Sequence, residues 1–146
     1  MKKMLLIVIM ILIYSGNAWG EKTEKINPTL ENISGVYAEC AAYFAIVYNA
    51  FLSSGDAGTA AQYAKSQESA VSTAMLLAKQ GRTLKMAYEV TKSRIEMYSQ
   101  QMKKDTKNRN ENISILANKY AFSCKEAIEN PEKFTIELAD KLEKKN

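Results

Sequence analysis

"GVYAECAAYFAIVYNAF", residues 35–51, decides the fold of this 146-residue chain, because it is apolar around almost the whole circumference of a helix. Spacings of three and four residues, which are typical of one helix face, run through it and begin before it, as Leu30, Ile33, Tyr37, Cys40, Phe44, Val47 and Phe51. A helix that is apolar on all sides is normally the centre of a bundle or a membrane span. Glu39 and Asn49 argue against a span, since carboxylates are costly and rare inside membranes. We therefore predict a central, buried helix.

The two cysteines, Cys40 in this stretch and Cys124, are predicted to form a disulfide between two helices. Exported proteins meet an oxidising compartment, where a pair of thiols tends to become a disulfide. The chain has no histidine, so a Cys–His nucleophile and a Ser–His–Asp triad are excluded. A structural zinc site usually needs four Cys or His ligands, and only two are present. Separate buried thiols remain the alternative.

Residues 1–20 have the pattern of a secretory signal peptide. Lys2 and Lys3 precede an uncharged apolar run at 4–14, and Ala18 and Gly20 are small residues placed for cleavage after Gly20. The run is shorter than the roughly 17–25 residues that a spanning helix needs, although an uncleaved membrane anchor is an alternative. We expect a periplasmic or secreted protein. Removal of the two lysines also lowers the formal net charge of +4 by two.

Residues 21–146 are predicted to form a single helical domain, in which residues 21–28 are a polar leader. Strand patterns are almost absent, and four further helices are expected after the first. The second follows a loop at 53–58, with Thr59 and Gln62 as a capping box, and the third covers about 83–104. The fold class is therefore all-α, a small four- to five-helix bundle.

The last two helices follow a polar connection at 103–112. The fourth begins near Ile113 and carries Cys124 in the middle of its apolar stripe. A short fifth helix should begin at Asn130-Pro131, since Asn is a favoured N-cap and Pro is favoured at the first helical position. Both cysteines therefore lie on core-facing helix faces, as a disulfide between helices requires.

Positive charge is concentrated at residues 79–109, which hold nine Lys or Arg against three Asp or Glu. The densest cluster is Lys103, Lys104, Lys107 and Arg109, a candidate patch for an anionic lipid surface, an envelope polymer or an acidic protein. The alternative is a solvated helix face, because several of these charges have an opposite charge four residues away. No nucleic-acid recognition motif is present, so nucleic acid is not an expected partner.

Two charged residues, Glu39 and Arg94, lie on otherwise apolar faces of the first and third helices. A buried ion pair between them is one prediction, since an unpaired buried charge is far costlier than a paired one. In the alternative, Arg94 extends to solvent along its apolar stem and Glu39 lies near the end of a neighbouring helix.

The motifs of catalysis and cofactor binding are missing from the sequence: it has no Gly-rich phosphate loop, metal-ligand cluster or nucleophile elbow. We expect neither an enzyme nor a bound cofactor or metal, but a binding protein for another envelope or secreted protein, such as an inhibitor or immunity-type binder. One alternative is a stress chaperone that exposes apolar helix faces. The layout resembles acid-stress periplasmic chaperones, which are also short and helical with one disulfide, although none of their motifs is found. Another is a binder of anionic membrane surfaces through residues 79–109.

Overall fold

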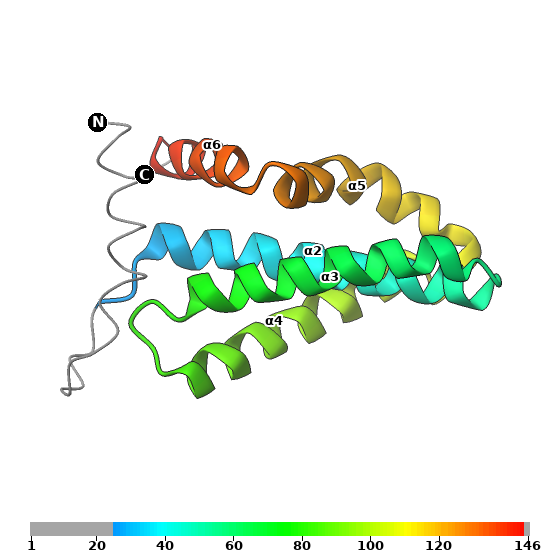
Figure 1. Cartoon of the computed structure of the whole chain (residues 1–146), viewed down its shortest axis with the longest axis horizontal. Coiled ribbons are helices and arrows are strands. Elements are labelled where there is room, and N and C mark those ends of the chain that lie inside the picture. Colours follow the sequence, from blue (N-terminus) through cyan, green and yellow to red (C-terminus); the bar gives the residue numbers. More distant parts are fainter. Residues whose placement is uncertain (1–24, 145–146) are drawn as a thin grey trace.

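The computed structural model describes residues 25–144, and five α-helices and one short 3-10 helix make up the regular structure of this part of the chain (Figure 1). They are α2 (Pro28–Ser53), α3 (Ala57–Ala78), α4 (Leu84–Asp105), η1 (Asn110–Asn112), α5 (Ile113–Glu129) and α6 (Pro131–Glu143). The all-α prediction is confirmed. The predicted signal peptide, its cleavage after Gly20 and residues 21–24 of the predicted leader lie outside the described residues.

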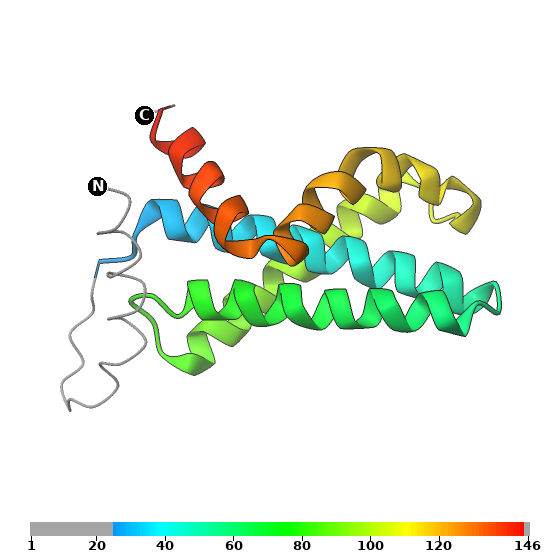
Figure 2. The same ribbon diagram turned by 45° about the horizontal axis from the view of Figure 1, so that its top comes forward.

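Helix α2 is the centre of the bundle and contacts α3, α4, α5 and α6. In Figure 1, α3 lies antiparallel beside α2, while α4 runs below this pair and α5 and α6 run above it. Figure 2 shows that α5 and α6 form a V whose bend lies over α2. The Tyr37 hydroxyl of α2 holds this bend, since it donates a 3.2 Å hydrogen bond to the Ala127 carbonyl. An α2 surrounded in this way explains why its sequence is apolar on all sides.

The length and composition of α2 would also permit a membrane span, with a mean hydropathy of 1.2 over its most apolar window. Neighbouring helices cover most of its apolar surface between Ile33 and Val47. The buried residues of α2 are Ile33, Ser34, Gly35, Tyr37, Ala38, Cys40, Ala41, Ala42, Tyr43, Phe44 and Val47. Packing against α3 is close because α3 presents only alanines as fully buried residues, and these are Ala60, Ala70, Ala74 and Ala78.

The predicted disulfide joins α2 to α5. Cys40 and Cys124 have Cα atoms 5.3 Å apart and an S–S distance of 2.08 Å, and both residues are buried in one core cluster. This cluster also contains Met102 of α4 and Leu116 of α5. The bond therefore fastens the central helix to the second half of the chain inside the core.

The helix starts show where the local prediction was right and where it was wrong. Asn27 caps α2, because its side-chain oxygen accepts from the backbone N–H groups of Thr29 and Leu30. The predicted capping box of Thr59 and Gln62 is wrong: α3 begins at Ala57, and the Asp56 carboxylate accepts from the Thr59 N–H at 2.9 Å. Asp56 prevails because it combines an N-cap acceptor with a negative charge at the positive end of the helix.

The start of α6 follows the prediction in position only. Asn130 is its N-cap and Pro131 its first residue. The Asn130 side chain makes no capping bond and instead donates to the Glu126 carboxylate at 3.4 Å. Proline needs no capping acceptor for its own nitrogen, since it has no N–H.

Candidate interaction site

The predicted basic patch lies at one end of the bundle, where α4 ends and the chain turns towards α5. Lys103 and Lys104 belong to the last turn of α4, Lys107 and Arg109 follow in the connection, and all four residues are exposed. The connection is held by hydrogen bonds from the Asn108 N–H to the Lys103 carbonyl at 2.8 Å and from the Asn112 side chain to the Thr106 carbonyl at 2.9 Å. The patch is therefore built on an ordered turn.

This turn requires an unusual backbone conformation. Lys107 and Asn108 have φ angles of 54° and 57°, in the left-handed region that costs an L-residue roughly 1–2 kcal/mol. Asparagine tolerates that region better than most residues, but lysine has no such advantage. The turn thus keeps a cationic side chain at a position where glycine would be less strained.

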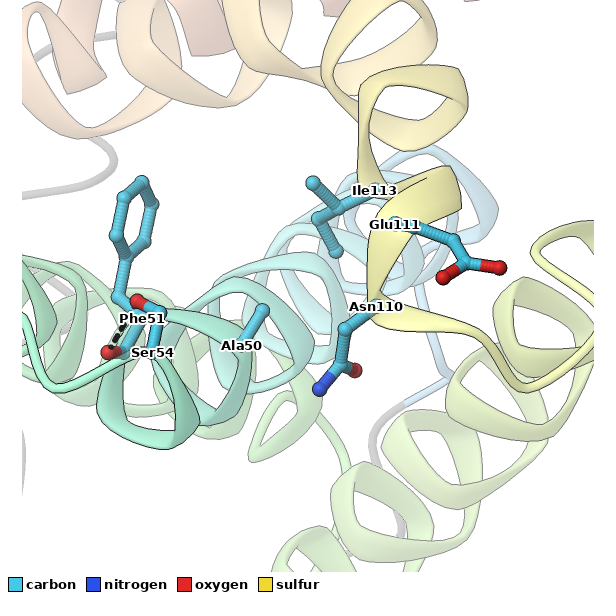
Figure 3. A pocket seen from close by; sticks show the side chains of 6 residues that line it. All are labelled: Ala50, Phe51, Ser54, Asn110, Glu111 and Ile113. Carbon is cyan, nitrogen blue, oxygen red and sulfur yellow. Dashed lines mark hydrogen bonds between the residues drawn. The ribbon is translucent and has the colours of Figure 1, made fainter.

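Beside the patch, two hollows adjoin between the end of α2 and the connection, and we refer to them together as the end groove. The first has a volume of about 290 Å³ and is lined by Ala50, Phe51, Ser54, Asn110, Glu111 and Ile113 (Figure 3). The second, of about 190 Å³, shares Asn110 and Ile113 and is lined further by Ile46, Asn49, Lys103, Thr106, Asn108 and Arg109. Sequence reasoning found the basic residues and missed the groove, because its two walls are about sixty positions apart in the sequence.

The end groove combines an apolar floor with a charged rim. The rim residue Arg109 donates to the Glu111 carboxylate at 3.4 Å, in a pair whose side chains are 67% and 72% exposed. Figure 3 shows the Glu111 carboxylate directed away from Ala50 and Phe51. An exposed pair of this kind is worth little, about 0–1 kcal/mol. Arg109 can therefore exchange this partner for another anion.

A second surface is the outward side of α4. Nine large apolar side chains are exposed in the described residues, and four belong to this helix at 52–60% exposure. Met86 and Met97 share one side of α4, whereas Leu84 and Tyr88 lie on roughly the opposite side. Met86, Val90 and Met97 are spaced by four and seven residues and form one row, which we refer to as the methionine row. The methionine row thus consists of two exposed methionines with the half-buried Val90 between them, a small apolar patch on one side of α4.

The predicted ion pair between Glu39 and Arg94 is not formed; Arg94 is paired with Glu31 instead. The Glu31 carboxylate accepts from Arg94 and from both terminal nitrogens of Arg82, at 2.6 and 2.9 Å. Arg94 also donates to the Ser34 hydroxyl, which in turn donates to the Ala74 carbonyl at 2.8 Å. This network, the Glu31 bridge, ties the start of α2 to α3, to the α3–α4 connection and to α4.

The pKa values of Glu31 and Glu39 are shifted in opposite directions. The hydrogen bond from Arg82 and the nearby Arg94 lower the pKa of Glu31 against the opposing effect of burial. Burial raises the pKa of Glu39, and the charge of Lys119 and the hydroxyl of Tyr120 only partly offset this. Glu31 is thus stabilised in its ionised form, while Glu39 is ionised at a cost.

Sequence reasoning missed Glu31 and Arg82 as partners. Arg82 lies in the basic stretch at 79–109, for which a solvated face was one alternative, yet its side chain is 10% exposed. No group of three or more Cys, Asp or Glu side chains that could hold a metal ion occurs within residues 25–144.

The chain was also compared with known proteins. No family model, no curated protein and no solved structure matches it. The geometry of the surfaces described above therefore carries the functional interpretation.

Proposed function

We propose that the protein is an exported, non-catalytic helical binding protein that acts on another envelope or secreted protein, as an inhibitor or immunity-type binder does. The observation that carries this proposal is the methionine row on α4, where Met86 and Met97 are each 54% exposed. Exposed apolar surface gathered on one element is typical of protein contacts. Methionine suits such contacts because its flexible, polarizable side chain adapts to a partner.

The scaffold supports a role in binding outside the reducing cytosol. The disulfide between Cys40 and Cys124 is the kind of bond that persists in oxidising compartments. It also occupies both thiols of the chain, and the sequence contains no histidine. Chemistry that depends on a free thiolate or an imidazole is therefore not available to this protein.

The test is capture of the partner by the disulfide-bonded protein at neutral pH, from the envelope and secreted fractions of its source. We expect one protein in stoichiometric amount. The double variant Met86→Gln/Met97→Gln should reduce its recovery at least about tenfold, since burying a methionine side chain is worth ~1.5–3 kcal/mol.

The matched control is Leu76→Gln on α3, where the leucine is 58% exposed and lies outside the methionine row. This variant should capture as much partner as the unchanged protein. Equal loss in the control and in the double variant, or no loss in either, would contradict the proposal.

A stress chaperone is the second candidate, and the Glu31 bridge is the observation that favours it. Protonation of Glu31 in acid would remove the only anion between Arg82 and Arg94 in that bridge and free α4 from the start of α2. A chaperone should suppress aggregation of several unrelated proteins after an acid shift. If the protein is a chaperone, its Glu31→Gln variant should suppress aggregation already at neutral pH. If it is a dedicated inhibitor, the variant should not suppress aggregation.

A further inference from the structure

We propose that the end groove binds a short acidic segment of a partner protein, with a large apolar side chain in the hollow beside Phe51 and a neighbouring carboxylate on Lys103 and Arg109. The inference rests on the proposed function in one respect, that the partner is a protein. It concerns a different surface from the methionine row, so the two can be tested separately.

The apolar half of the groove fits one large side chain. Ile46, Ala50, Phe51 and Ile113 contribute apolar walls to the two hollows. The larger hollow, about 290 Å³, is at the lower limit of the roughly 300–1,000 Å³ typical of sites for whole small molecules. Phe51 is held in place by stacking on Tyr63, with ring centroids 5.5 Å apart and planes 13° apart. The hollow therefore has a fixed wall against which a leucine or phenylalanine side chain can pack.

The charged half selects an anion. Lys103 and Arg109 line the second hollow, and no charged residue occurs in α2 after Glu39. Glu111 is the acidic residue among the lining residues of the groove, and its contact with Arg109 is weak and exposed. An incoming carboxylate can accept two parallel hydrogen bonds from the Arg109 guanidinium, which is the stronger geometry.

The turn that carries these cations is preorganised. Its left-handed Lys107 and Asn108 are held by hydrogen bonds rather than by favourable backbone preference. Strained residues of this kind persist where the surrounding structure fixes them, and they cluster at binding sites. A partner would therefore meet a connection whose backbone is already ordered, so that only the side chains of Lys103 and Arg109 have to adjust.

The shape and lining favour a peptide over a membrane surface. The hollows are small and are bordered by the exposed amides of Asn49, Asn108 and Asn110. Amide side chains offer both donors and acceptors, as a peptide backbone does. An anionic bilayer would be attracted by the lysines alone and would use neither the amides nor the hollow.

The test uses six-residue peptides with blocked ends, in which one phenylalanine is flanked by glutamates. We expect this peptide to shift the backbone amide resonances of residues 46–54 and 103–113 in the disulfide-bonded protein. A matched peptide with glutamine in place of each glutamate should bind at least about threefold more weakly. A peptide with serine in place of phenylalanine should also bind more weakly, to a similar extent. Added salt should weaken the binding of the acidic peptide.

Three variants test which charged side chains bind the peptide. Lys103→Gln/Arg109→Gln should lower the affinity for the acidic peptide about three- to tenfold, which corresponds to the loss of two exposed charge pairs. Glu111→Gln should raise the affinity for the acidic peptide, because the Glu111 carboxylate no longer competes with the peptide for Arg109. Lys141→Gln, an exposed lysine on α6, is the matched control and should change nothing.

The inference is overturned if the shifts fall on α4 alone, or if neutralising Lys103 and Arg109 leaves the affinity unchanged. Binding to phosphatidylglycerol vesicles without binding to the acidic peptide would also overturn it, in favour of a membrane surface. Shifts on α4 alone would instead place the peptide on the methionine row, while the other two results leave the methionine row untested. If partner capture still depends on Met86 and Met97, the proposed function stands while this inference fails.

Discussion

At the residue scale, Glu31 is the most constrained charge in the described structure. Two arginines from different segments donate to its carboxylate, and both are mostly buried. Removing that carboxylate leaves two guanidinium groups side by side without their shared acceptor. A single side chain thus holds three parts of the chain together: α2, the connection after α3, and α4.

Glu31→Gln is therefore expected to lower the free energy of unfolding by about 1.5–3 kcal/mol at neutral pH, the usual range for hydrogen bonds to charged groups. Because the pKa of Glu31 is lowered in the folded protein, its contribution is complete above the ordinary value of 4.5 and is lost as the pH falls below it. Urea unfolding at several pH values should show the variant and the unchanged protein converging in acid. Glu111→Gln is the control and should change stability by less than about 0.5 kcal/mol. A pH-independent difference would contradict this account.

Glu39→Gln should act in the opposite direction. Burial raises the pKa of Glu39, so its ionised form costs stability at neutral pH and its protonated form does not. The variant should have a higher melting temperature at pH 7, and the advantage should vanish as the pH falls through the raised pKa of Glu39 towards the ordinary value of 4.5. Thermal unfolding of the variant beside Glu68→Gln, an exposed glutamate of α3, checks this. A lower melting temperature would show that Glu39 has a stabilising partner.

At the scale of the elements, the apolar periodicity was enough to predict five helices and the burial of both cysteines. It was not enough to set how far one helix is displaced along another. Glu31 and Glu39 are both on α2, about 12 Å apart along its axis and roughly 80° apart around it. The position of α4 along and around α2 therefore decides which of them meets Arg94. The predicted start of α3 was wrong for a local reason. Asp56 and Thr59 are both good N-cap residues and lie three positions apart, so the sequence pattern does not decide between them.

The end groove could not be predicted from the sequence, because helix periodicity does not say how one element is placed against another. Phe51 belongs to the predicted buried face of the first helix, and the cluster at 103–109 predicts exposed charge. Neither pattern says that the connection folds back against the end of α2. That contact depends on two left-handed residues, Lys107 and Asn108, and neither is a glycine that would have marked the turn.

The close contact between α2 and α3 depends on alanine. Ala74 is fully buried, and its carbonyl accepts the Ser34 hydroxyl at 2.8 Å. Ala74→Leu should therefore cost about 1–3 kcal/mol, the usual range for overpacking a core. Ala61→Leu, on the exposed side of the same helix, should stay within about 0.5 kcal/mol. Equal stability of the two variants in urea would show that α3 can move away without loss.

At the scale of the whole molecule, the disulfide carries a large share of the stability. It closes a loop with a sequence separation of 84 residues, which on the chain-entropy model is worth about 4–5 kcal/mol. A small domain has roughly 5–15 kcal/mol in total. The sequence allowed this bond to be predicted because both cysteines lie on apolar helix faces and the chain offers no other partner for either.

Cys40→Ser/Cys124→Ser should accordingly unfold at a much lower urea concentration, with a loss of several kcal/mol. The unchanged protein in excess reductant should behave in the same way, which serves as the control for the serine hydroxyls. Mass spectrometry of the non-reduced protein should find no free thiol. Two free thiols, or equal stability with and without reductant, would contradict the prediction.

The position of this bond in the sequence also determines what a protease can release. Both candidate contact surfaces, the methionine row and the end groove, are built from residues between Cys40 and Cys124. A single cut in an exposed connection of that interval opens the ring but leaves both fragments covalently attached. A cut beyond Cys124 would instead detach α6 and leave the ring whole. Nicked molecules should therefore keep their binding segments together until the disulfide is reduced.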